Sequence, residues 1–162
     1  MGNVRLIQLF KRFLTNNCVG IASGGGHLFE LLACIPDQAT SQMIFVTQKN
    51  IHTKRSLHNT KHIFILDPHK SVIKYCVNFF QAFRIFLVTR PRAVISTGAG
   101  IAIPFILISK FFGSKIIFIE TGARITNASK TGRALYRYTD VFFVQYEPLL
   151  EIYPDAILGS LQ

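Results

Sequence analysis

The sequence of 162 residues predicts a single α/β domain, Rossmann-like, with a parallel sheet of about six strands. Three observations lead to this prediction. Short apolar runs alternate along the chain with longer segments of helical character. The apolar runs are continuous rather than alternating, as expected when helices cover both faces of a sheet. The length suits one hydrophobic core, and neither an internal repeat nor a second domain is apparent.

The first half of the chain is expected to supply three strands. Cys18–Ala22 is an apolar run that ends at three glycines, and Leu28–Cys34 is predicted as the helix that follows. We expect the second and third strands at Met43–Thr47 and His62–Leu66. The connector between them, Gln48–Lys61, is polar and basic and is expected to hold one helical turn.

A long helix is predicted at Val72–Val88. Its polar residues Lys74, Asn78, Gln81 and Arg84 lie three or four apart, so they share one face of the helix. This pattern favours a crossover helix that lies on the sheet. A helix that lies on a membrane or faces a partner is the alternative.

The alternation continues to the end of the chain. The remaining elements are expected to be a strand at Ala93–Ser96, a helix at Ile101–Phe112, a strand at Lys115–Ile119, a helix at Ser129–Tyr138 with Ser129 as its cap, and a strand at Val141–Val144. The tail after Tyr146 is expected to hold one helical turn before Pro154.

The charge balance indicates anionic partners. The formal net charge is +10, which favours nucleic acid, anionic lipid or phosphorylated substrates. The chain has no dense stripe of Lys and Arg with interleaved aromatic residues, so we do not expect it to bind nucleic acid.

Residues 1–16 are predicted to form a basic amphipathic helix. Its apolar face would carry Leu6, Ile7, Phe10, Phe13 and Leu14, opposite Arg5, Gln8 and Arg12. Such a helix can lie in the interface of a membrane. The alternative is an ordinary helix packed on the domain formed by residues 17–162.

Three strand ends are expected to meet at one edge of the sheet, where parallel α/β sheets bind their ligands. They are Ser23–His27, Thr97–Gly100 and Glu120–Arg124. Glycines followed by a helix start offer free backbone N–H groups to an anion. The alternative is a tight turn between strand and helix, which needs glycine in any case.

The glycine loops do not match the known nucleotide motifs. A dinucleotide fingerprint would need glycine at Phe29 and an acid after the second strand, and the second loop departs from it at Ile103. No Gly-Lys-Ser/Thr follows the glycines, so a P-loop is excluded. The sequence therefore favours phosphate binding over NAD or ATP binding.

Two titratable residues, His27 and Glu120, lie at the predicted strand ends. His27 would serve as a general base, a phosphate donor or a capping residue, and the local sequence leaves the three open. Glu120 ends an apolar strand and would be a base, a ligand of a substrate hydroxyl or a partner of Arg124. Neither a metal nor a cofactor is predicted, since the remaining histidines lie without clustered acidic or cysteine ligands.

Several motifs in fixed order resemble a known family: S-G-G-G-H-L-x-E, S-T-G-A-G-I-A-I-P, F-I-E-T-G-A-R-I, S-x-T-G-R-x-L-Y and V-Q-Y. The series resembles the acceptor-side, membrane-anchor subunit of the split UDP-GlcNAc transferase of dolichol-linked oligosaccharide synthesis. It is closest to bacterial counterparts used in capsule and exopolysaccharide assembly. It is more distantly similar to the N-terminal domain of the lipid II-forming GlcNAc transferase. The match extends from Cys18 to Gly159.

The resemblance implies the N-terminal, acceptor-binding half of a GT-B glycosyltransferase, with the UDP-sugar held by a separate chain in a heterodimer. The acceptor would be a sugar on a polyprenyl diphosphate, and the reaction would take place at the cytoplasmic face of the plasma membrane. Attachment is expected to be peripheral, because only Val4–Leu14 stands where relatives often carry a hydrophobic span. The resemblance does not identify the sugar transferred.

The resemblance implies roles for the two glycine loops and Glu120, and together with the expected mechanism it leads us to predict three groups of site residues. The acceptor diphosphate would contact Ser23, Gly24, Gly25, Gly26, Thr97, Gly98, Ala99, Gly100, Arg124 and Arg133. The base would be His27 or, as second choice, Glu120, in an inverting transfer. The partner would contact Tyr146, Leu149, Leu150 and Tyr153, unless these residues pack on the domain's own core.

Two other functions remain open from the sequence. The chain would be a non-catalytic anchor and activator if the partner held every catalytic group. It would be a free-standing Rossmann-like enzyme if it bound a nucleotide by itself.

Overall fold

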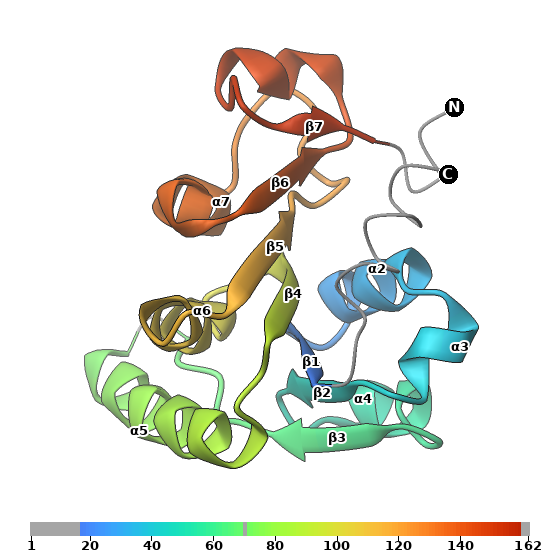
Figure 1. Cartoon of the computed structure of the whole chain (residues 1–162), viewed down its shortest axis with the longest axis vertical. Coiled ribbons are helices and arrows are strands. Elements are labelled where there is room, and N and C mark those ends of the chain that lie inside the picture. Colours follow the sequence, from blue (N-terminus) through green and yellow to red (C-terminus); the bar gives the residue numbers. More distant parts are fainter. Residues whose placement is uncertain (1–16, 70, 160–162) are drawn as a thin grey trace.

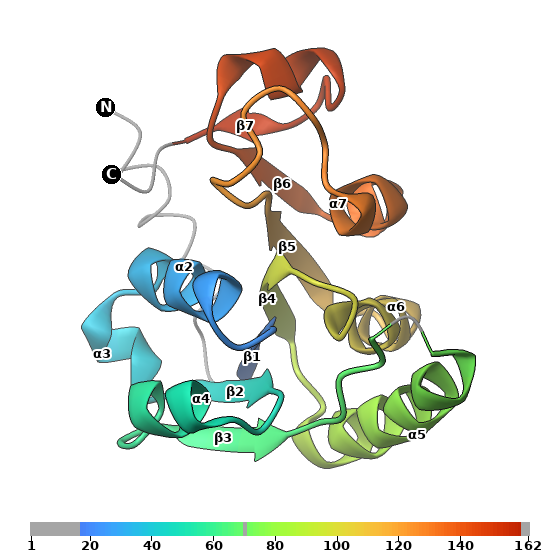
Figure 2. The ribbon, with the colours of Figure 1, turned by 180° about the vertical axis from the view of Figure 1, so that it is seen from behind.

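In the computed structural model, which describes residues 17–69 and 71–159, the strands form one parallel sheet in the order β3-β2-β1-β4-β5-β6-β7 (Figure 1). The strands are β1 (Cys18–Ala22), β2 (Ile44–Thr47), β3 (Lys61–Phe64), β4 (Ala93–Gly98), β5 (Lys115–Ile119), β6 (Val141–Val144) and β7 (Ile157–Leu158). The apolar strands are buried because helices cover both faces of the sheet, as Figure 2 shows from behind.

One face of the sheet is covered by α2 (Gly26–Cys34), α3 (Asp37–Thr40) and α4 (Ile51–Ser56). The other is covered by α5 (Val72–Thr89), α6 (Ala102–Phe111), α7 (Lys130–Leu135) and the 3₁₀ turns η1 (Tyr136–Tyr138) and η2 (Glu147–Glu151). Ser129 caps α7 as expected, since its Oγ accepts a hydrogen bond from Gly132 N at 2.8 Å.

The predicted Rossmann-like fold is confirmed, with two additions. The short helix α3 and the edge strand β7 were not expected from the sequence. β7 has two residues and pairs with β6 through Phe143 and Ile157, which is too short a run to give a strand pattern. The predicted amphipathic helix at residues 1–16 lies outside the described residues.

The strand order creates a switch point between β1 and β4. From β1 the chain moves outward to β2 and β3, and α5 then returns it to β4 on the other side of β1. The helices that follow the two central strands, α2 and α6, therefore lie on opposite faces of the sheet (Figure 1). Such a point leaves a crevice at the carboxyl edge of the sheet.

The prediction of α5 as a crossover helix is confirmed. Its polar face holds the chain after β3, because Asn78 Nδ2 donates to Leu66 O at 2.7 Å and Leu66 N donates to Gln81 Oε1 at 2.8 Å. The outward side of α5 carries exposed apolar side chains such as Phe80 and Val88, with the exposed Arg84 between these two on the same face. By length and composition alone the helix would be able to cross a membrane, yet only 28% of it is buried in this domain.

Asp140 ties α6 and β5 to the start of β6. Its carboxylate accepts hydrogen bonds from Lys110 Nζ at 2.7 Å, Ile116 N at 2.9 Å and Lys115 Nζ at 3.1 Å. Burial alone would raise the pKa of Asp140, but these hydrogen bonds outweigh it and hold the pKa below its usual value.

We expect Asp140→Asn to lower the free energy of unfolding at pH 7 by about 1 kcal/mol, since solvent screening limits a partly exposed pair. Because the pKa of Asp140 is lower in the native state, its carboxylate stabilises the fold at pH values above the unfolded pKa of about 3.9. This contribution is lost as the pH falls through the native pKa. The difference between wild type and variant in urea unfolding should therefore shrink below about pH 4. Glu151→Gln, an exposed acid, is the control and should show no such pH-dependent difference.

Candidate functional site

The first glycine loop follows β1 and opens into α2. Gly24 N donates to Gln48 Oε1 at 2.7 Å, which fixes the loop to the end of β2. Gly25 has φ of 97°, a conformation that favours glycine. Within the described residues, the amides of Gly25 and Gly26 donate to no acceptor. They therefore form an open pair of donors at the start of a helix, the arrangement that holds anions.

The second glycine loop follows β4, the neighbour of β1. Gly98 has φ of 108°, and Ala99, with φ of 76°, adopts a left-handed conformation that is strained for a residue with a side chain. The amides of Ala99 and Gly100 likewise find no acceptor among the described residues. Thr97 Oγ1 donates to His27 O at 2.6 Å and so joins the two loops.

His27 lies between the two loops. A Cβ added to Gly98 would lie 3.8 Å from His27 Cε1, so the ring sits against the second loop. The side chain is 31% exposed, while its Nδ1 is buried and has no hydrogen-bond partner among the described residues. The nearest charge is Glu30 Oε2, one turn later on α2, at 3.8 Å from Nδ1. This oxygen is also buried, and no described residue donates a hydrogen bond to it.

Glu30 is a site residue that was not predicted. Its Oε1 accepts hydrogen bonds from Gly122 N at 2.9 Å and Thr121 Oγ1 at 3.0 Å, so it joins α2 to the loop after β5. The signal was present in the sequence, since His27 and Glu30 are spaced to share one face of a helix. The carboxylate thus contacts the loop after β5 with one oxygen and lies beside His27 with the other.

Glu120 is enclosed rather than open to a ligand. The residue is 1% exposed, and its Oε2 accepts from Tyr153 OH at 3.0 Å and Ser129 N at 3.3 Å. Its Oε1 accepts from Thr121 N at 3.2 Å. The structure therefore corrects the expectation that Glu120 serves as a base or pairs with Arg124, because protein groups surround its carboxylate.

The residues packed around Glu120 show how tightly it is enclosed. A Cβ added to Gly132 would lie 2.6 Å from Tyr153 OH, so only glycine fits there. Burial, together with the charge of Glu120, raises the pKa of Tyr153 above its usual range. Tyr153 therefore stays protonated and remains a hydrogen-bond donor to the carboxylate.

The predicted partner residues in the tail divide into two pairs. Leu149 and Tyr153 are 0% and 1% exposed and pack in the core on the α6 side of the sheet, so the expectation that they face a partner is wrong for both. The short turn η2 folds them back onto β6. Tyr146 and Leu150 are only partly buried and remain candidates for a partner contact.

Arg124 and Arg133 are exposed, and neither forms an ion pair with another described residue. Their contact with a diphosphate stays a prediction. In the part of the chain that the structure describes, no three His, Cys, Asp or Glu side chains come together as metal ligands.

Comparison with known proteins gives matches of three kinds. A family model described as "Oligosaccharide biosynthesis protein Alg14 like" matches residues 65–161, which include the second glycine loop and Glu120. The UDP-N-acetylglucosamine transferase subunit ALG14 of Kluyveromyces lactis is 49% identical over 43 residues, which are 26% of this chain and 18% of that protein. The chain thus spans less than a fifth of that relative's length in the match.

The crystal structure of MurG from Acinetobacter baumannii matches with a TM-score of 0.68 and 21% sequence identity. The match covers 83% of this chain and 43% of MurG. At this identity the match shows that the two share a fold.

The enclosure of Glu120 yields a prediction about stability. Tyr153→Phe removes one hydrogen bond from a buried carboxylate, and we expect a loss of about 1 to 3 kcal/mol in the free energy of unfolding. Tyr138→Phe, which alters an exposed phenol, is the matched control and should change it by less than about 0.5 kcal/mol. Chemical denaturation followed by circular dichroism would measure both, and equal stabilities would contradict the enclosure of Glu120.

Proposed function

The chain belongs to the Alg14-like family of oligosaccharide biosynthesis proteins, and from this premise we propose that it is the acceptor-binding subunit of a two-chain, membrane-associated, inverting glycosyltransferase. A separate donor-binding subunit would hold a UDP-sugar, and this chain would hold a sugar on a polyprenyl diphosphate. The Kluyveromyces relative is named as a transferase subunit, which supports an enzyme made of more than one chain. The structural match supports the same proposal, because this chain corresponds to only 43% of the MurG chain.

One observation carries the proposal. His27 lies at the switch point of the sheet between two glycine loops whose amides are open. Open amides at helix starts suit phosphate oxygens, and a histidine beside them suits a hydroxyl that must lose a proton. The proposed setting is the assembly of capsular polysaccharide or exopolysaccharide.

In the proposed reaction the acceptor hydroxyl attacks the anomeric carbon of the UDP-sugar. The bond from that carbon to UDP breaks, and UDP leaves with the electron pair. His27 takes the hydroxyl proton through its Nε2. The imidazolium that forms is stabilised by Glu30 Oε2, which lies 3.8 Å from Nδ1, and this arrangement gives two unpaired buried atoms a partner during the reaction.

The diphosphate of the acceptor is placed at the amides of the two loops, with Arg124 and Arg133 as further cations. Both arginines are exposed, so their charges are available to a ligand.

Tyr146 and Leu150 are the tail residues of this chain that we propose to contact the donor-binding subunit.

An apolar surface on α5 and α6 supports attachment to a membrane. The two helices pack side by side, with Phe86 stacked on Phe112 at 4.8 Å between ring centroids. The exposed apolar residues of this surface are Val72, Ile73, Val77, Phe79, Phe80, Leu87, Val88, Leu107, Phe111 and Phe112. We propose that this α5–α6 surface lies on the cytoplasmic face of the plasma membrane. The net charge of +10 supports attraction to anionic lipid.

A second candidate function is that of a non-catalytic anchor and activator. The enclosure of Glu120 favours it, because this leaves His27 as the one base candidate from the sequence. Loss of His27 separates the two functions.

We expect His27→Ala, assayed with the donor-binding subunit, to lower the rate of sugar transfer by about 10² to 10⁴, the usual contribution of a general base. Glu30→Gln should lower the rate less, since it removes the charge that stabilises the imidazolium of His27 during transfer. His58→Ala, which alters an exposed histidine on the connector, is the control and should keep the wild-type rate. A wild-type rate in His27→Ala would establish the anchor function instead.

The membrane assignment predicts the behaviour of two exposed side chains on α5. Phe80 and Val88 are 68% and 82% exposed, and replacing both by Glu should weaken binding to anionic vesicles about tenfold or more. The matched control places Glu at Phe29 and Ile51, which are 74% and 70% exposed on helices of the other face. Vesicle co-sedimentation measures the difference, and equal losses in the two pairs would refute an α5–α6 membrane surface.

A further inference from the structure

Gln145 follows β6 directly, in the sequence motif V-Q-Y, and has no role in the reaction proposed above. The residue is half-buried, and its Nε2 donates a hydrogen bond to Glu120 O at 3.1 Å. In the ladder between β5 and β6 the last residue pair is Ile119 and Phe143, and Glu120 N donates to Phe143 O at 2.9 Å. The amide of Gln145 therefore continues the pairing of these two strands with a side chain.

The same amide lies against Gly122. A Cβ added to Gly122 would lie 3.0 Å from Gln145 Oε1 and 3.2 Å from its Nε2, so a side chain at this position would press on the amide. The φ of Gly122 is not in the left-handed region, so the close approach of Gln145 is the feature that favours glycine here. Gln145 thus contacts both the carbonyl of Glu120 and the backbone of Gly122.

Gly122 in turn holds the carboxylate of Glu30. Its amide donates to Glu30 Oε1 at 2.9 Å, and Thr121 Oγ1 donates to the same oxygen at 3.0 Å. While Oε1 is held in this way, Oε2 lies 3.8 Å from His27 Nδ1. The orientation of the carboxylate beside His27 therefore depends on the position of Gly122.

The loop after β5 gives Gly122 little support of its own. Residues 123–127 are all exposed, and none of them belongs to a helix or a strand. The position of Gly122 therefore depends on contacts with other elements, which are Glu30 on α2 and Gln145 after β6. Of these two residues, Gln145 is the one outside the pair formed by His27 and Glu30.

We propose that Gln145 is a positioning residue of the transfer reaction, which holds Gly122 where its amide directs Glu30 toward His27. The proposal rests on the proposed function, in which His27 takes the proton of the acceptor hydroxyl. The carboxylate stabilises the imidazolium only once the proton moves to His27. The contribution of Gln145 therefore belongs to the transition state and not to the binding of the acceptor.

The test measures sugar transfer by the full chain together with the donor-binding subunit. We expect Gln145→Ala to lower kcat by about tenfold, comparable with the loss of one hydrogen bond, and to leave KM for the acceptor within about twofold. Gly122→Ala should give the same result, because its methyl group would meet the amide of Gln145. If circular dichroism shows that Gln145→Ala does not fold, Gly122→Ala carries the test.

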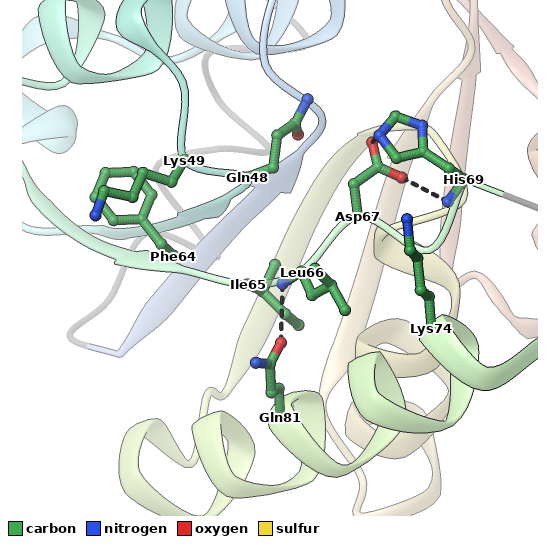
Figure 3. A pocket seen from close by; sticks show the side chains of 9 residues that line it. All are labelled: Gln48, Lys49, Phe64, Ile65, Leu66, Asp67, His69, Lys74 and Gln81. Atoms are coloured by element: carbon green, nitrogen blue, oxygen red, sulfur yellow. Dashed lines mark hydrogen bonds and ion pairs between the residues drawn. The ribbon is translucent and has the colours of Figure 1, made fainter. Parts of the chain in front are cut away.

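The matched control is Gln81→Ala. Gln81 is also a half-buried glutamine that bonds to the backbone after a strand, since its Oε1 accepts from Leu66 N at 2.8 Å (Figure 3). It lines a cavity of about 520 Å³ at the carboxyl ends of β2 and β3, and this lining includes neither Gln145 nor Glu30. The control should keep kcat within about twofold of wild type.

A double variant separates positioning of Glu30 from a general effect on the fold. If Gln145 acts through Glu30, adding Gln145→Ala to Glu30→Gln should cause no further loss of kcat, because effects that pass through one group are not additive. Additive losses, or an equal loss in Gln81→Ala, would overturn the proposal. So would a wild-type kcat in both Gln145→Ala and Gly122→Ala.

The NMR signals of the His27 ring give a readout that does not depend on transfer. They should move in Gln145→Ala, because the carboxylate beside Nδ1 changes its position, and they should stay in place in Gln81→Ala. If they move while His27→Ala transfers sugar at the wild-type rate, the proposed function is wrong although Gln145 positions Glu30 as stated. If they stay in place and Gln145→Ala keeps the wild-type kcat while His27→Ala abolishes transfer, the positioning role is wrong and the proposed function stands.

Discussion

The pairing of β1 with β4 is the constraint on which the candidate site depends. The two strands are parallel neighbours although β2, β3 and four helices separate them in the chain. Their register shifts at the end, where Ile21 pairs with Ser96 and Ala22 pairs with Gly98. The irregularity leaves Thr97 without a partner in the ladder, and its hydroxyl donates to His27 O instead. Bulges of this kind often redirect a side chain beside a functional site.

Two carboxylates fix the segment after β5 from opposite sides. Glu30 reaches it from α2 through Thr121 and Gly122, while Glu120 holds Ser129 and, through Tyr153, the tail. Burying a carboxylate is costly unless hydrogen bonds compensate, so the bonds to Glu30 Oε1 and to both oxygens of Glu120 hold the loop and the tail in these positions. The segment that carries Arg124 is thereby placed next to the helix that carries His27.

The start of α5 brings exposed apolar residues to the edge of the sheet that carries the glycine loops. Val72 and Ile73 are both 78% exposed, and Tyr75 of the same turn lies against Gly100 of the second glycine loop. This arrangement fits the function proposed above, in which the chain would meet the bilayer while the phosphate of its acceptor stays within reach of donors from the protein.

The sequence by itself determined the alternation of strands and helices, the two glycine loops and the position of His27, because each depends on residues close together in the chain. Periodicity and turn chemistry are local signals. Only the tertiary structure decided that Glu120 is enclosed, that Glu30 lies beside His27 while bonded to the loop after β5, and that the tail packs on the core. These outcomes depend on contacts between residues that are separated by 33 and by 91 positions in the chain, and local sequence patterns do not record such contacts. A carboxylate at a strand end looks the same in sequence whether protein groups or a ligand meet it, and burial by Tyr153 made the difference here.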